Sequence, residues 1–275
     1  MERNDFRERV CDIARDTDKT VDERVGLMLQ LRDSRNESDP DLSSQTDVDI
    51  FEVMLPMLCE QESSPQVDVD IVYAATMLAE AYVDLGMMRQ MRPLAASVAE
   101  ILRDANAGET VSDELLNPLP RLLDAVRQTA YNHALRELLT EMIETVCLLG
   151  KPLTDYKREA TDLLKLNVLI WPDRDCPRSK ALEHSLAGIF TPDELVGIIF
   201  DPVIGHLRRD PVEYTERWED IIYDVEDELE QRFKGERRHM GFCYRFWHEK
   251  ADLLREKYGI VWHSPAVMNP SVHFD

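Results

Sequence analysis

A histidine and a glutamate stand side by side at His248-Glu249, and an aspartate follows one helical turn later at Asp252. In zinc proteases two histidines at this spacing bind the metal, and the glutamate beside the first activates water. Here aspartate replaces the second histidine, and no third ligand follows downstream. The spacing therefore favours an i, i+4 polar pair on the wet face of a helix. The alternative hypothesis is a metal-dependent enzyme that uses His239, His248 and Asp252.

Other residue patterns that could support chemistry are incomplete. A Glu-x-x-His pair ends at His239, but a di-iron bundle needs two such pairs and further glutamates. Cys176 lies between Arg174 and Arg178, which would lower the pKa of its thiol, yet no Cys-His arrangement accompanies it. No glycine-rich phosphate loop and no G-x-S-x-G motif occurs. We expect no cofactor and a non-enzymatic protein.

The charge balance narrows the class of partner. The chain of 275 residues has 54 acidic and 32 basic side chains, for a formal net charge of -22. Such a field repels phosphate backbones and anionic lipid, so neither nucleic acid nor a membrane surface is expected as a partner. A basic protein is a better electrostatic match, although acidity also serves solubility.

Several features of the chain favour a cytoplasmic location. The segment MERNDFRERV carries charges where a signal peptide has its apolar core. No window approaches the roughly 18 apolar residues that a membrane span needs. The five cysteines are far apart and form no C-x-x-C pair, which is typical of reduced thiols.

Helical spacing of apolar residues and only 10 glycines predict an all-α fold. The breaks divide it into roughly ten helices in stacked antiparallel hairpins, as in an α-solenoid or helical repeat, followed by an extended C-terminal tail. Thr20 with Glu23 predicts a capping box, and Thr191 with Glu194 predicts a second one. Asp210 before Pro211 is typical of another helix start.

Composition predicts two parts. Residues 1–170 are expected to form the helical-hairpin array, with a mobile acidic loop over 33–47. Most of the aromatic residues follow the break at 171–179. Residues 171–275 are therefore expected to form an aromatic-rich C-terminal helical subdomain with a packed tail at 260–275.

A helical stripe runs through Ile71, Ala75, Leu78, Tyr82 and Leu85. Within it, residues 77–86 (MLAEAYVDLG) resemble the first helix of a tetratricopeptide repeat. The family has a leucine, a small residue, a tyrosine and a glycine at the steps that Leu78, Ala79, Tyr82 and Gly86 hold here. The resemblance implies stacked helical hairpins with a concave surface for partner recognition. An ordinary antiparallel helix pair is the alternative.

The C-terminal part predicts a helical hairpin. Residues 213–230 contain nine acidic residues and one basic residue, whereas residues 231–258 contain eight basic and four acidic residues. We expect the two limbs to lie antiparallel, with Trp218, Ile222 and Leu229 among the residues that face the second limb.

The second limb of this hairpin carries two apolar faces. One includes Trp247, and the opposite one carries Phe242, Phe246 and Leu253. The tail at 260–275 also alternates apolar anchors with prolines. We expect it to fold back over the Phe242/Phe246/Leu253 stripe; the alternative is docking on another subunit, which would give a homo-oligomer, or on another protein.

The sequence thus predicts a protein-protein interaction or scaffold protein. Its expected surfaces are the face that bears Tyr82, the acidic helix, and the aromatic C-terminal limb with its tail. Aromatic anchors would bind in a groove while acidic residues at the rim steer a basic partner. The candidate partner-binding residues are Tyr82, Glu219, Asp220, Asp224, Asp227, Phe242, Phe246 and Trp262.

Overall fold

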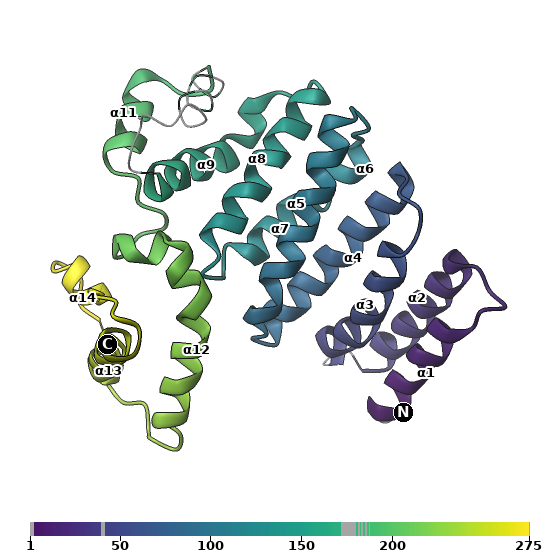
Figure 1. The fold of residues 1–275 in the computed structure, drawn as a ribbon, viewed down its shortest axis with the longest axis horizontal. Helices are drawn as coiled ribbons and strands as arrows, with labels where there is room; N and C mark the ends of the chain where they lie inside the picture. Colours follow the sequence, from purple (N-terminus) through teal and green to yellow (C-terminus); the bar gives the residue numbers. More distant parts are fainter. Residues whose placement is uncertain are drawn as a thin grey trace. The chain divides into compact units, whose positions relative to one another are not determined.

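A computed structural model describes residues 3–39, 42–171 and 188–274, together with residues 180, 182, 184 and 186 (Figure 1). Among these residues every regular element is a helix and no β-strand is present, which confirms the predicted all-α fold. Cys176, Arg174 and Arg178 lie outside the described residues. No helix in the described part of the chain has the length and apolar character that crossing a membrane requires.

The chain forms two compact units. The first comprises Met1–Thr129 and Thr140–Pro152, and the second comprises Ala130–Leu139 and Leu153–Asp275. The boundary predicted at residue 171 therefore falls inside the second unit. The reason is visible in hydrogen bonds that residues 130–133 make to the later chain, described below.

The first unit consists of successive helices that pack against one another. In Figure 1 each of the helices α2 to α5 lies beside the helix before it. The elements are α1 (Arg3–Arg15), α2 (Val21–Ser38), α3 (Ser43–Cys59), α4 (Pro65–Asp84), η2 (Met88–Gln90), α5 (Met91–Ala107), α6 (Asp113–Leu116), α7 (Leu119–Val126) and the end of α8 (Asn132–Leu148).

Local capping sets the start of α2, as predicted. The Thr20 hydroxyl accepts the backbone N–H of Glu23, and the Glu23 carboxylate accepts the N–H of Thr20 at 2.8 Å. The end of α2 differs from the sequence-based expectation. Residues 33–38 belong to α2 and residues 43–47 belong to α3, so the predicted loop at 33–47 is wrong for both of these stretches. Arg35 and Asp47 are buried, and this tertiary burial holds a polar segment helical.

The predicted stripe of α4 is largely confirmed. Ile71, Ala75, Leu78 and Tyr82 are all buried, whereas Leu85 lies just beyond the helix and is 40% exposed. Helix α4 starts at Pro65, and the Ser64 hydroxyl accepts a backbone N–H of its first turn. Pro93 lies in the first turn of α5, where a missing N–H leaves no helical hydrogen bond unmade.

The second unit begins with the first residues of α8. Its other elements are η3 (Leu153–Tyr156), α9 (Lys157–Ile170), α11 (Pro192–Phe200), η4 (Pro211–Tyr214), α12 (Glu216–Arg232), α13 (Phe242–Tyr258) and α14 (Pro265–Met268). The capping box of Thr191 and Glu194 is present at the start of α11. Asp210 caps only the short η4, because Thr215 is extended and serves as a new cap for α12.

The acidic and basic limbs of the second unit pair as helices α12 and α13. Lys250 pairs with Glu226 and Lys257 with Glu228, each at 2.8 Å. The side chains predicted to face the second limb, with Trp218 and Leu229 among them, are buried in one cluster with Leu253 and Leu254. Arg217 near the start of α12 donates to the backbone carbonyl of Tyr258 at the end of α13, and Phe233 after α12 packs on Phe242 at the start of α13, which is the order of contacts that an antiparallel pair gives.

The tail packs on its own unit, and only in part where the sequence predicted, because Ile260 and Trp262 share a buried cluster with Leu253. The Phe242/Phe246 side of α13 is covered by Phe233, whose ring centroid lies 5.1 Å from that of Phe242 and 5.8 Å from that of Phe246. The tail instead places Phe274 against Trp247 on the opposite face, at 5.1 Å. Phe233 covers the first stripe because it directly follows α12.

Hydrogen bonds fasten the tail to residues 208–213. Asp210 accepts the backbone N–H of His263 at 2.8 Å, and its carboxylate also lies 2.6 Å from the imidazole Nδ1 of His263. The side-chain amide of Asn269 exchanges two hydrogen bonds with the backbone of Arg208, at 2.8 and 2.9 Å. The partners in these contacts are far apart in the sequence and do not follow helical periodicity, so a helical wheel does not predict them.

Candidate functional site

The residues of the metal hypothesis are not brought together. His248 and Asp252 form the i, i+4 pair expected on a wet helix face, at 3.4 Å, with the His248 side chain 76% exposed. The Nδ1 atom of His239 lies 2.8 Å from the carbonyl oxygen of Met240. The described residues contain no group of three or more His, Cys, Asp or Glu side chains arranged to hold a metal ion.

Glu219, predicted to bind a partner, has a structural role. It is only 3% exposed, and its carboxylate accepts the backbone N–H of His133 at 2.9 Å. The Tyr223 hydroxyl similarly accepts the N–H of Ala130 at 2.9 Å. These two bonds satisfy amide groups near the start of α8. They also explain why residues 130–139 belong to the second unit.

The other predicted residues of the second unit fall into two groups. Asp220, Asp224 and Asp227 are exposed and follow one another along one face of α12. Trp262 is 7% exposed, stacks on Trp218 at 6.1 Å, and donates its indole N–H to Glu213 at 2.8 Å. Like Phe242 and Phe246, it serves the packing of its own unit. The three aspartates are the exposed residues of this set.

Tyr82 lies in a groove of the first unit, with α4 as its floor and α3 and α5 as its walls. The groove has a volume of about 400 Å³, within the range of pockets that bind ligands. It is lined by Glu52, Leu55, Pro56 and Cys59 of α3, by Ile71, Ala75, Leu78 and Tyr82 of α4, and by Gln90, Pro93, Leu94, Ser97 and Val98 at the start of α5. The floor is apolar and buried, while the rim residues Pro56, Cys59, Gln90, Pro93 and Ser97 are exposed.

The groove contains one charged group, the carboxylate of Glu52. The Tyr82 hydroxyl donates to one oxygen of this carboxylate at 3.3 Å, and Arg7 of α1 lies 3.2 Å from the other. Burial, followed by the negative charge of Glu52, raises the pKa of Tyr82 to about 12. The phenol therefore stays protonated and keeps Glu52 oriented. The arrangement can bind a group that combines an apolar body with a hydrogen-bond donor.

Cys59 gives the rim a thiol. It is the last residue of α3 and is exposed, and partial burial of the thiol raises its pKa. A raised pKa lowers the thiolate fraction, so this cysteine is not an activated nucleophile. Because Cys59 lies at the rim, a bulky substitution at this position can block the groove.

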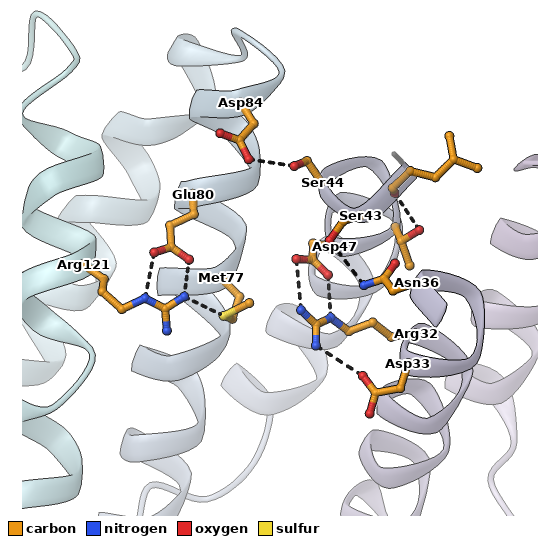
Figure 2. Close-up of polar contacts among 12 residues, drawn as sticks. Arg32, Asp33, Asn36, Ser43, Ser44, Asp47, Met77, Glu80, Asp84 and Arg121 are labelled. Carbon is orange, nitrogen blue, oxygen red and sulfur yellow. Dashed lines mark hydrogen bonds and ion pairs between the residues drawn. The ribbon is translucent and has the colours of Figure 1, made fainter. Parts of the chain in front are cut away.

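Polar contacts on the other side of α4 hold the helices that frame the groove (Figure 2). Figure 2 shows Arg32 of α2 paired with Asp47 of α3, and Ser44 of α3 donating to Asp84 of α4 at 2.7 Å. Arg121 of α7 donates to Glu80 of α4 at 2.7 Å. Hydrogen bonding to Asp47 raises the pKa of Arg32, which keeps that pair charged. These contacts join α2, α3, α4 and α7, and the Ser44–Asp84 bond holds the α3 wall against the α4 floor.

The sequence indicated Tyr82 but not the groove around it. Glu52, Cys59 and Ser97 come from helices far apart in sequence, and their periodicity alone does not show that α3 and α5 leave a gap. One usable indication is Pro56, which interrupts an otherwise regular helical segment. Comparisons with protein-family models, with curated proteins and with solved structures find no match.

Proposed function

We propose that the protein is a non-enzymatic interaction protein that binds a segment of another protein in the groove between α3 and α5. The observation that carries this proposal is the groove itself, which combines a buried apolar floor with one oriented carboxylate. Such a combination is typical of pockets that bind an anchor side chain. The short resemblance of residues 77–86 to a tetratricopeptide repeat supports the same function, because most of these residues belong to α4, which forms the floor of the groove.

The proposal assigns partner binding to the first unit and gives the tail a different role. The tail anchors Ile260 and Trp262 are buried within their own unit, so self-association through the tail is not part of the proposed function. The exposed aspartates of α12 would add long-range attraction for a basic partner. The free thiols of Cys11, Cys59, Cys147 and Cys243 support a reducing, cytoplasmic location.

Blocking the groove tests the proposed function. A displayed library of random 12-residue peptides is selected on the purified protein, and enriched peptides are measured against the variants Cys59→Trp and Ser97→Trp. Each adds an aromatic side chain at the exposed rim, from opposite walls. Excluding one buried anchor worth about 1.5–3 kcal/mol weakens binding roughly 10- to 150-fold.

The matched control is Cys147→Trp, which makes the same substitution at an exposed cysteine of the first unit outside the groove. We expect its peptide affinity to equal that of the unmodified protein. If no enriched peptide discriminates between the groove variants and Cys147→Trp, the groove is not the binding site.

A further inference from the structure

We infer that the groove accepts an amphipathic partner segment that inserts one large apolar side chain and places a lysine or arginine against Glu52. This inference rests on the proposed function and adds the chemistry of the partner. It depends on three observations: the charge of the α3–α4 wall, the acceptor atoms at Glu52, and the direction of the helices at the rim.

Helices α3 and α4, which form one wall and the floor, are strongly acidic, and of their acids Glu52 lines the groove. Residues 43–84 contain nine aspartates and glutamates and neither lysine nor arginine. Arg3 and Arg7 of α1 approach this wall from outside, where they contact the carboxylates of Asp49 and Glu52. Arg32 and Arg121 likewise pair with Asp47 and Glu80, so four cations contact these nine acids and an excess of negative charge remains. A partner with basic residues complements it, and an acidic partner is repelled.

Glu52 keeps acceptor capacity for a further donor. One oxygen accepts from the Tyr82 hydroxyl and the other pairs with Arg7, and each carboxylate oxygen can accept a second hydrogen bond. Pro56 adds to this capacity, because it has no N–H to donate the usual i to i−4 bond to the backbone carbonyl of Glu52. An ammonium or guanidinium group can use several acceptors at once, whereas a neutral apolar ligand would use none.

The helix directions place the partner's cation on the α3 side of the groove. Helix α3 ends at the rim, at Cys59, and α5 begins at the opposite rim, beside Pro93. The carbonyl end of a helix carries partial negative charge and the amide end partial positive charge. The effect falls off within one turn, so it disfavours a lysine or arginine beside Pro93 at the start of α5 but adds little at Glu52, seven residues before the end of α3.

The peptide selection described above also tests this inference, through the sequences of the peptides that need an open groove. We expect those peptides to carry a large apolar residue with lysine or arginine within one helical turn. Glu52→Gln, which keeps the acceptor for Tyr82 but removes the charge, should weaken them about three- to tenfold at low salt. The control Glu100→Gln removes the same charge from an exposed position of α5 outside the groove and should change nothing.

Each other outcome overturns the inference in a recognisable way. Groove-dependent peptides without basic residues, or an unchanged affinity for Glu52→Gln, refute the partner chemistry while the proposed function stands. The absence of any groove-dependent peptide refutes both. Concentration-dependent dimerisation, measured by sedimentation and abolished by Cys59→Trp but not by Cys147→Trp, would identify a second copy of the chain as the occupant instead.

Discussion

Trp262 is the residue whose removal should most damage the second unit. It is 7% exposed, and its ring centroid lies 6.1 Å from that of Trp218. The Lys250 ammonium lies 5.4 Å from the Trp218 ring and 5.3 Å from the Trp262 ring. The Trp262 indole also donates to Glu213, so one side chain joins the tail to α12, α13 and the segment before α12.

The expected loss for Trp262→Ala is about 3–5 kcal/mol in the free energy of unfolding, the range found for buried tryptophans truncated to alanine. A domain of this size has a total stability of about 5–15 kcal/mol. The variant should therefore keep its fold near 10 °C but lose a large part of its resistance to urea. The matched control is Val261→Ala, at a neighbouring tail residue that is 69% exposed, which should change stability by less than about 0.5 kcal/mol.

Tryptophan fluorescence is a selective assay for this prediction. The four tryptophans are Trp171, Trp218, Trp247 and Trp262, and all belong to the second unit. Urea unfolding followed by fluorescence therefore reports that unit, whereas far-ultraviolet circular dichroism reports helices in both. We expect Trp262→Ala to lower the fluorescence midpoint strongly. A shift no larger than that of Val261→Ala would refute the packed tail.

A second variant separates the contribution of the Trp262–Glu213 hydrogen bond to stability from the contribution of packing. Trp262→Phe keeps an aromatic ring but leaves the half-buried Glu213 carboxylate without its indole donor, at a cost of about 1–3 kcal/mol. Burial raises the pKa of Glu213, and the Trp262 bond opposes that rise. An acid with a raised pKa in the folded state loses stability as the pH rises through that pKa. The deficit of Trp262→Phe should therefore shrink as the pH falls toward 4, and a deficit independent of pH would contradict the assigned bond.

Two further predictions concern ionisation. The absorbance difference between the unmodified protein and Tyr82→Phe should show a phenol that titrates near pH 12. Because the pKa of Tyr82 is raised in the folded state, its contribution to stability declines as the pH rises from about 10. A titration midpoint near 10 would mean that Tyr82 is not held in the groove. For Glu194, hydrogen bonds from Lys157 and from the Thr191 backbone lower the pKa to about 2. The contribution of Glu194 to stability is thus present above the unfolded pKa of about 4.3 and is lost as the pH falls through 2. Carboxyl NMR should show a higher pKa for Glu194 in Lys157→Met, and an unchanged value would exclude the Lys157 contact in solution.

Local hydrogen bonding explains which elements were predictable. The capping boxes at Thr20 and Thr191 join groups only three residues apart, so their geometry follows from the residues themselves. The stripe through Ile71 and Tyr82 is equally local, because helical periodicity alone assigns its residues to one face. For the same reason His248 and Asp252 were correctly assigned to a wet helix face.

Partners distant in sequence decided the rest. Glu219 looked like a surface acid within an acidic helix, yet it bonds an amide 86 positions away. Trp262 looked like a partner anchor, but its donor meets Glu213, 49 positions away. Phe233, in the short segment that joins α12 to α13, took the place that the tail was expected to fill. In each case the local pattern was predicted correctly, but the residue that packs against it or bonds to it was not.

From its residues alone, this chain determined the all-α class, the capping boxes at Thr20 and Thr191, the faces of α4 and α13, and an acidic net charge. Those properties depend on groups within one or two helical turns, or on a simple sum of charges. Only the tertiary structure decided which apolar faces are covered, which acids are buried, and that α3 and α5 leave a groove beside Tyr82. A groove is a gap between elements, and its existence depends on how several helices pack rather than on any one of them.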